Sequence, residues 1–243
     1  MIDTHCHIIP GVDDGPSSTE GALRMAAAAV KEGMHTIIAT PHHATKRYIN
    51  TARKIQRRVE ALNSKLKKNN IPLKIYPGQE FRLTDAFRSE HQAGRIQTLA
   101  ESSYLLVELP SRGIPDYFHK FLAYIKQHGI HAVIAHPERN LGIIRNPDQV
   151  IAWIEQHGVR LQVTTQSLIG FFGEEVQNTA SYLCRKRWIH LIGSDAHSTI
   201  RRSFYTKEGH EVLERLCGPA YLQALQQHAA QLVLGGKIGD LHT

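Results

Sequence analysis

Short runs of β-branched and apolar residues alternate with longer amphipathic segments along this chain, and the alternation constrains its fold more than any other feature. Such runs between turn signals predict strands, and an apolar stripe at helical spacing predicts a helix. Strands that alternate with helices are typical of an α/β fold with a parallel sheet. The predicted strands cover residues 4–9, 36–40, 73–76, 104–108, 131–136, 159–164 and 188–192.

Helix-end signals occupy the segments between these runs. Ser17 with Glu20 is a capping-box pattern that predicts the start of a helix ending at Gly33, and Asn50 predicts the start of a basic helix. Proline near a helix start and glycine after a helix end mark the next two helices. One begins at Pro115-Asp116 and ends at Gly129, and the other begins at Asn146-Pro147 and ends at Gly158. Two more helices are predicted near residues 211–216 and 220–234.

The length of 243 residues suits one large domain, and we expect residues 1–243 to form it because the chain has no internal repeat and no linker. Cys6, Cys184 and Cys217 lack the spacing of a disulfide framework, which favours a reducing compartment. We find no secretory signal pattern and no apolar stretch long enough to span a membrane, so we expect a cytoplasmic protein. The sequence leaves the oligomeric state open and is compatible with an oligomer.

The net charge of +7 raises the question of an anionic partner such as nucleic acid. Two basic clusters, residues 53–58 and 65–68, lie on one predicted helix whose apolar stripe is formed by Ile55, Val59, Leu62 and Leu66. A solvated basic helix face is the simpler interpretation, because the aromatic residues that stack on bases are missing there. We therefore do not expect a nucleic-acid partner.

Histidine and carboxylate side chains recur where the predicted strands end. His5 and His7 stand two apart on the first strand, so both side chains leave the same face, and Asp14 follows in a loop with Pro and Gly. Six of the seven strand ends carry such groups, and only a closed ring brings all of these ends to one point. The sequence thus predicts a seven-stranded, TIM-like (β/α) barrel. The candidate metal ligands are His5, His7, Asp14, His42, Glu80, Glu108, His136, Asp195 and His197.

Nine ligands exceed what one ion can use. Histidine and carboxylate together favour zinc, manganese or iron over calcium or magnesium, and a single zinc takes about four ligands. Two or three divalent ions are therefore expected, with a carboxylate such as Glu80 bridging them. His43 adjoins His42 and is expected to support the site rather than to bind metal.

The chain carries the motifs T-H-C-H, T-P-H-H, P-G-Q-E, A-H-P-E-R-N and S-D-A-H, which together resemble the polymerase and histidinol phosphatase (PHP) superfamily. Their spacing over essentially the whole chain is most similar to its bacterial tyrosine-phosphatase branch, which is associated with capsule and exopolysaccharide synthesis. The resemblance implies a distorted seven-stranded barrel with a trinuclear site. Manganese is the leading expectation for the ions, with iron or zinc as alternatives.

By motif, the resemblance assigns ligands to three ions. The first takes His5, His7, Glu80 and Asp195, the second Glu80, Glu108 and His136, and the third Asp14, His42 and His197. It further implies that Arg139, in A-H-P-E-R-N, clamps phosphate together with an arginine just after S-D-A-H. That second arginine falls on Arg202, with Arg201 as a one-residue alternative.

These assignments imply hydrolysis of phosphotyrosine by a metal-activated hydroxide. Metal binding lowers the pKa of water from ~15.7 to roughly 7, and a phenolate of pKa ~10 leaves without a strong general acid. The implied partner is a phosphotyrosine protein, namely a bacterial tyrosine kinase of exopolysaccharide synthesis. A cysteine phosphatase is excluded because it needs an arginine six residues after its cysteine, where this chain has Val12, His190 and Gln223.

Several alternatives stay open on the sequence. Within the same superfamily the chain could be a histidinol-phosphate phosphatase, or a nuclease or other phosphoesterase. An amidohydrolase also uses paired histidines on a barrel, but it normally needs a bridging lysine that these strand ends lack. The non-enzyme alternative is a metal-bound regulatory scaffold. Residues 82–95 and 168–175 are expected to flank the site, where Phe171 and Phe172 either stack on a phenol ring or pack internally.

Overall fold

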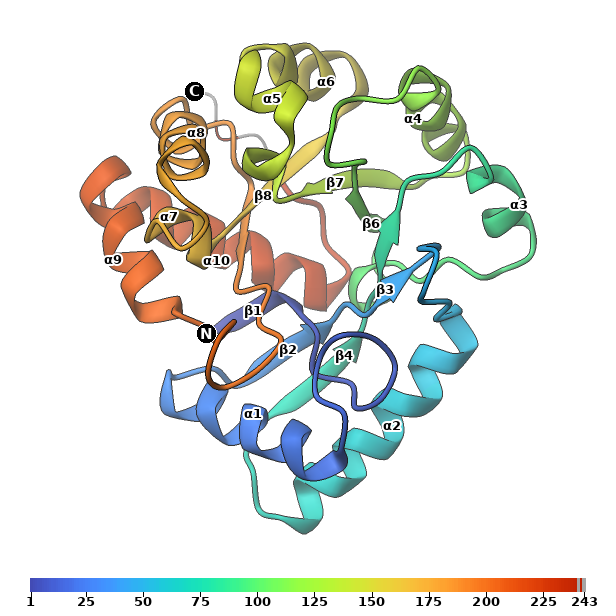
Figure 1. Cartoon of the computed structure of the whole chain (residues 1–243), viewed down its shortest axis with the longest axis vertical. Coiled ribbons are helices and arrows are strands. Elements are labelled where there is room, and N and C mark those ends of the chain that lie inside the picture. Colours follow the sequence, from blue (N-terminus) through green and yellow to red (C-terminus); the bar gives the residue numbers. More distant parts are fainter. Residues whose placement is uncertain (240, 242–243) are drawn as a thin grey trace.

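The computed structural model of the chain describes residues 1–239 and 241, and these form an α/β fold whose strand pairs are all parallel (Figure 1). The described residues contain nine strands in two sheets, ordered β1-β2-β4 and β3-β5-β6-β7-β8-β9. Their bounds are β1 Ile2–Cys6, β2 Thr36–Ala39, β3 His42–His43, β4 Lys74–Pro77, β5 Glu80–Arg82, β6 Tyr104–Glu108, β7 His131–Ala135, β8 Arg160–Thr164 and β9 Leu191–Gly193. The predicted class, α/β with parallel strands, is confirmed.

Each predicted strand run overlaps a strand, although β1 begins two residues before its run, and the second and third runs are followed by short extra strands, β3 and β5. Pro41 interrupts the second because proline donates no ladder hydrogen bond. Gly78 interrupts the third where the backbone packs closely, since a Cβ there would lie 2.7 Å from Ile38 Cγ2 and 3.1 Å from the Ala39 carbonyl oxygen. The strands therefore divide into two sheets rather than the single seven-stranded ring that we predicted.

The first strand also contacts the segment after the last strand. His5 O accepts a hydrogen bond from Asp195 N at 2.8 Å, and His7 N donates to Ala196 O at 2.9 Å. Asp3 reinforces this seam, because its two carboxylate oxygens accept from Ser194 N at 2.9 Å and from Ser194 Oγ at 2.6 Å. The carboxyl ends of β1 and β9 are thereby held side by side.

Helices cover the outer faces of both sheets, with α1 and α2 beside β1, β2 and β4, and α4 to α6 and α8 beside the larger sheet (Figure 1). Among the described residues the helices are α1 Thr19–Lys31, α2 Ala52–Lys68, α3 Phe87–Gln92, α4 Phe118–Gln127, α5 Leu141–Arg145, α6 Gln149–His157, α7 Thr165–Leu168, α8 Glu174–Arg185, α9 Thr206–Cys217 and α10 Pro219–Leu234. Two 3-10 turns, η1 Leu99–Glu101 and η2 Pro137–Arg139, precede β6 and follow β7. None of these helices is long and apolar enough to cross a membrane.

The glycines predicted to end helices do so, but the predicted starts of the helices are shifted. Gly33, Gly129 and Gly158 all have positive φ just after a helix, as expected of glycine C-caps. The cap of α1 is Ser18, whose Oγ accepts from Gly21 N at 3.1 Å, and not Ser17. The cap position of α2 is Thr51, so the prediction for Asn50 was wrong by one residue.

The starts of α4 and α6 were predicted two to three residues early, at the prolines, because each proline lies in a turn before the helix. Four helices, α3, α5, α7 and α8, were not predicted. The predicted helix near 211–216 is the C-terminal half of the longer α9.

The largest buried cluster lies between the larger sheet and its helices, and Phe118 on α4 is at its centre. Its ring is fully buried and meets the ring of Trp153 edge-on at 4.8 Å between centroids. The stripe predicted on the basic helix is also buried, at Ile55, Val59, Leu62 and Leu66 of α2, while the lysines and arginines of that helix are exposed. The interpretation as a solvated basic face is confirmed.

We predict that Phe118→Ala lowers the free energy of unfolding by about 3–5 kcal/mol, because it removes a fully buried ring and leaves a cavity. Urea denaturation checks this. Leu234→Ala is the control, because the Leu234 side chain is 78% exposed and its loss should change the free energy of unfolding by less than ~0.5 kcal/mol. Equal midpoints for the two variants would contradict this account of the core.

Candidate metal centre

His5 and His7 leave β1 on the same face and lie fully buried, with their Nε2 atoms 3.3 Å apart. Thr4 Oγ1 donates its proton to Ile192 O, so it must accept from Gln162 Nε2. This fixes the orientation of the Gln162 amide, whose Oε1 then accepts from His5 Nδ1 at 2.8 Å. His7 Nδ1 donates to Asp13 Oδ2 at 2.8 Å. Each Nδ1 therefore carries the proton, and two Nε2 lone pairs face each other.

Two buried carboxylates converge on the same pair of nitrogens. Glu80 Oε2 lies 3.3 Å from His7 Nε2 and 3.7 Å from His5 Nε2, and Asp195 Oδ1 lies 3.2 Å and 3.3 Å from them. Among the described residues, Glu80 Oε2 makes no hydrogen bond of regular geometry, and its short contacts are to histidine nitrogens. Such a group of buried acceptors is costly unless a cation shares it, so these residues fit a divalent metal ion.

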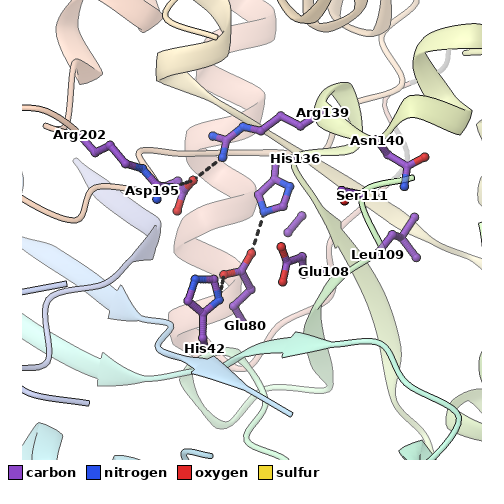
Figure 2. A pocket seen from close by; sticks show the side chains of 11 residues that line it. His42, Glu80, Glu108, Leu109, Ser111, His136, Arg139, Asn140, Asp195 and Arg202 are labelled. Atoms are coloured by element: carbon purple, nitrogen blue, oxygen red, sulfur yellow. Dashed lines mark hydrogen bonds and ion pairs between the residues drawn. The ribbon is translucent and has the colours of Figure 1, made fainter. Parts of the chain in front are cut away.

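A second group surrounds the other side of Glu80 (Figure 2). His136 Nε2 lies 2.7 Å from Glu80 Oε1, His42 Nδ1 lies 2.8 Å from Glu80 Oε2, and Glu108 is close enough to His42 and Glu80 to share an ion with them. Glu108 Oε1 also accepts from Arg82 Nη1 at 2.8 Å. These side chains line a pocket of about 250 Å³. Glu80 thus lies between two groups, as a bridging carboxylate would.

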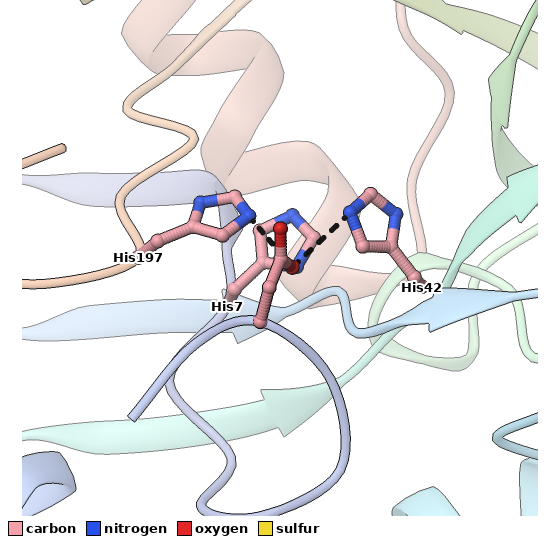
Figure 3. A group of neighbouring side chains, drawn as sticks. His7, His42 and His197 are labelled. Carbon is pink, nitrogen blue, oxygen red and sulfur yellow. Dashed lines mark ion pairs between the residues drawn. The ribbon is translucent and has the colours of Figure 1, made fainter. Parts of the chain in front are cut away.

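A third group lies at the rim of the pocket (Figure 3). Asp14 Oδ1 is 3.2 Å from His197 Nε2 and 3.4 Å from His42 Nε2, and the His197 ring stacks on His7 at 3.8 Å between centroids. His197 Nδ1 faces the Asp195 carbonyl oxygen at 2.9 Å, which leaves its Nε2 lone pair toward Asp14. The Asp14 side chain is 45% exposed, so this group is the one most open to solvent.

All nine candidate ligands therefore meet at the carboxyl ends of the strands. The grouping is more continuous than the assignment by motif, because His7 belongs to both the first and third groups and His42 to both the second and third. His43 lies apart from them. Its Nε2 contacts Glu90 Oε2 at 2.9 Å and its Nδ1 accepts from Asn50 N, which holds the loop after β3 in place.

Two arginines bind the oxygen of Asp195 that faces away from the histidines. Arg139 Nη1 and Arg202 Nη2 each lie 2.6 Å from Asp195 Oδ2, and both side chains line the pocket. Arg139 is further held by Thr164 Oγ1 at 2.7 Å and by the Phe172 ring, 3.9 Å from its guanidinium carbon. Arg202 contacts His197 Nε2 at 3.1 Å. Arg201 does not reach the pocket and lines a neighbouring hollow.

Backbone turns aim two of these side chains into the pocket. His136 and Asp195 both follow a strand directly or closely, and both have positive φ, of 31° and 53°. Non-glycine residues seldom adopt this conformation, which costs on the order of 1–3 kcal/mol and persists at functional sites. These turns direct the His136 and Asp195 side chains toward the cluster instead of along the sheet.

Charges on the facing groups shift the pKa values of the metal-free cluster. Burial lowers the pKa of His7, but the charge and hydrogen bond of Asp13 outweigh burial and raise that pKa well above its usual range. Burial raises the pKa of Glu80, yet the charges of His42 and His5 hold it well below the usual value. The pKa of Asp195 is likewise low because Arg139 and His5 overcome the effect of burial. In the metal-free cluster, the proton on His7 thus supplies positive charge that a bound cation would otherwise supply.

Sequence reasoning missed the residues that orient the ligands. Asp13 accepts from His7 Nδ1, Gly15 N and His42 N at 2.8, 3.0 and 3.1 Å, and so joins two ligand-bearing segments. Gln162 fixes His5 from β8, the strand whose end supplies no candidate ligand. The available sequence signal was a glutamine between Leu161 and Val163 in a predicted strand, because a polar residue at such a position needs a hydrogen-bond partner.

We predict that Asp13→Ala weakens metal binding roughly 10- to 100-fold, because His7 and the backbone of His42 lose their orienting acceptor. The measurement is the dissociation constant of Mn²⁺ by competition with a chelator. Asp116→Ala, which removes an exposed carboxylate before α4, is the control and should leave the constant unchanged. Equal affinities for both variants would show that Asp13 does not support the centre.

Comparison with known proteins agrees with this geometry. A family model described as "Capsular polysaccharide synthesis, CpsB/CapC" matches residues 1–235. Tyrosine-protein phosphatase YwqE from Bacillus subtilis (strain 168) is 36% identical over 233 residues, covering 96% of this chain and 91% of YwqE. CapC from Staphylococcus aureus is 38% identical over 210 residues, covering 86% of this chain and 81% of CapC.

The solved structures include a close counterpart. It comes from the crystal structures of YwqE from Bacillus subtilis and CpsB from Streptococcus pneumoniae, described as unique metal-dependent tyrosine phosphatases. It superposes with a TM-score of 0.95 at 35% sequence identity, over 100% of this chain and 98% of the other. The match of the family model to nearly the whole sequence is decisive for classification, and the chain belongs to the CpsB/CapC family of capsular polysaccharide synthesis proteins.

Proposed function

We propose that the chain, acting as one domain over residues 1–243, is a metal-dependent protein-tyrosine phosphatase. The observation that carries the proposal is the convergence of nine histidine and carboxylate ligands in one cluster, beside a pocket that two arginines line. The names of YwqE and of its structural counterpart support this activity and its dependence on metal. The β1–β9 seam and the pairing of β3 with β5 support a distorted, TIM-like barrel as the frame.

The three groups would hold two or three divalent ions. The residues would be His5, His7, Glu80 and Asp195 for one ion, Glu80, Glu108 and His136 for a second, and Asp14, His42 and His197 for a third. The mixture of imidazole and carboxylate supports manganese, with iron or zinc as alternatives. Bound divalent cations lower the pKa of water and neutralise charge on phosphoryl oxygens.

Arg139 and Arg202 would position the phosphate. Each uses one terminal nitrogen on Asp195 Oδ2, and each retains N–H groups that can point into the pocket. A guanidinium binds two phosphate oxygens in a fixed fork, which suits a monoester dianion. Asp195 thus connects the two parts of the site, because Oδ1 faces the histidines while Oδ2 orders both arginines.

The aromatic residues expected near the substrate have different roles. The Phe172 ring packs on Arg139, so it holds that guanidinium rather than a phenol ring. Phe171 is 44% exposed in the hollow next to the pocket and remains available to a substrate. A phenolate of pKa ~10 leaves readily without a strong general acid, which supports phosphotyrosine as a substrate. The proposed physiological substrate is a bacterial tyrosine kinase of exopolysaccharide synthesis, and the proposed location of this chain is the cytoplasm.

We predict that manganese-loaded protein hydrolyses a phosphotyrosine peptide in preference to histidinol phosphate, and that a chelator abolishes the activity. His136→Ala should lower turnover at least ~100-fold, the loss seen when one electrostatic stabiliser is removed from an active site. His119→Ala, which removes an exposed histidine on α4, should keep full activity. Initial rates with both substrates provide the check. A preference for histidinol phosphate would keep the centre but overturn the proposed substrate.

We further predict that metal affinity falls as the pH falls, beginning above pH 6.5. Burial lowers the pKa of His42 and His136, but the nearby Glu80 carboxylate outweighs burial and raises both above 6.5. Each ligating histidine must lose its proton before metal binds, so the raised pKa values move the competition to higher pH. Mn²⁺ affinity measured between pH 8 and pH 5 checks the sign, and an affinity independent of pH would contradict a histidine-rich centre.

A further inference from the structure

A second hollow of about 610 Å³ opens beside the phosphate pocket, between the start of α1 and residues 197–202. The two share Arg202, and Asp14 and His197 of the third ligand group also line the hollow. A group bound there would therefore lie next to the reacting phosphate. None of the chemistry proposed above uses the remaining side chains of this hollow.

Two arginines give the hollow its charge. Consecutive residues Arg201 and Arg202 point in different directions, so that Arg202 reaches Asp195 while Arg201 faces the hollow with Arg24 from α1. Arg24 and Arg201 are both exposed, and neither forms an ion pair with any described residue. Asp14 is the one carboxylate among the lining residues, and its charge is committed to the proposed metal centre. Among the described residues that line the hollow, no carboxylate other than Asp14 offsets this positive charge, and Glu20, one turn before Arg24 on α1, does not line it.

Apolar side chains accompany this charge. Phe171 is 44% exposed and Ile200 is 82% exposed, and both line the hollow. Both side chains are therefore accessible to a peptide that enters the hollow. Lys67 on the basic face of α2 also lines a hollow, of about 540 Å³, but no candidate ligand lines that hollow. The hollow at Arg24 and Arg201 differs because it adjoins the candidate metal centre.

We propose that this hollow is a subsite for a second anionic side chain of the peptide that carries the reacting phosphotyrosine, with Arg24 and Arg201 as its specificity residues. The anion is a carboxylate or a second phosphate, and the inference rests on the proposed phosphatase function. An extended peptide advances about 3.3–3.6 Å per residue, so a side chain within about three residues of the phosphotyrosine can reach a hollow that adjoins the pocket.

A peptide fits this hollow better than a nucleic acid does. The charge lies in one hollow directly joined to the phosphate pocket, whereas a nucleic-acid surface presents a longer basic track with several stacking aromatic rings. Phe171 is the one exposed aromatic ring that lines the hollow.

The experiment compares three sets of peptides on manganese-loaded full-length protein. Each peptide has one reacting phosphotyrosine, and a position within three residues of it on either side carries Gln, Glu or a second phosphotyrosine. For the best position, KM for the anionic peptide should be about five- to tenfold below KM for the Gln peptide, since exposed ion pairs contribute modestly. Arg24→Ala with Arg201→Ala should remove this difference, and the Glu and phosphotyrosine arms show which anion is preferred.

Two control variants remove the same charge elsewhere. Arg58→Ala changes an exposed residue of α2 and should leave the KM ratio intact, whereas Arg47→Ala changes a hollow that adjoins His42 and Glu108. A ratio near one in the unmodified protein, or an equal loss in Arg58→Ala, would overturn the subsite. A loss confined to Arg47→Ala would also overturn it, because the anion would then bind beside Glu108. Hydrolysis of p-nitrophenyl phosphate reports the metal centre separately, so its absence would mark failure of the proposed phosphatase function instead.

Discussion

Hydrogen bonds between the first strand and the segment after the last strand are the interaction on which the rest of this structure depends. His5 O and His7 N bind the backbone of Asp195 and Ala196, and the Asp3 carboxylate holds Ser194 beside them. Residues separated by about 190 positions in the chain are thereby placed side by side. Without this seam Asp195 would meet neither histidine, and the two arginines that bind it would lose their common anchor.

The seam brings together buried polar groups whose charges and lone pairs repel one another unless a cation or proton lies between them. Two imidazole lone pairs face each other at 3.3 Å in a fully buried site, with two carboxylates beside them. Those lone pairs are exposed only in the neutral rings that bind metal. In the metal-free protein a proton on His7 offsets part of the negative charge, because the charge and hydrogen bond of Asp13 outweigh burial and raise the pKa of His7. A ligand that binds only the folded state increases the free energy of unfolding, so cation binding stabilises the packing of the strand ends that hold its ligands.

The candidate ligands could be predicted because each belongs to a short local pattern. His5 and His7 stand two apart at the end of the first strand, and Glu80 and Asp195 follow the predicted strands by a few residues. The residues that orient them could not be predicted in the same way. Gln162 contacts His5 across 157 positions of sequence, and Asn50, predicted as a helix cap, instead donates to Val12 O and His42 O. Such partners depend on which strands become neighbours, and no local pattern encodes that.

By itself, the sequence determined the α/β class, the order of the strands and the set of residues at their carboxyl ends, because strand and helix periodicity and ligand type are local properties. The tertiary structure decided which of these residues share an ion, that Arg202 rather than Arg201 reaches Asp195, and that the strands divide into two sheets at Pro41 and Gly78. These outcomes depend on the packing of segments distant in the chain and on the direction in which each backbone turn sends its side chain.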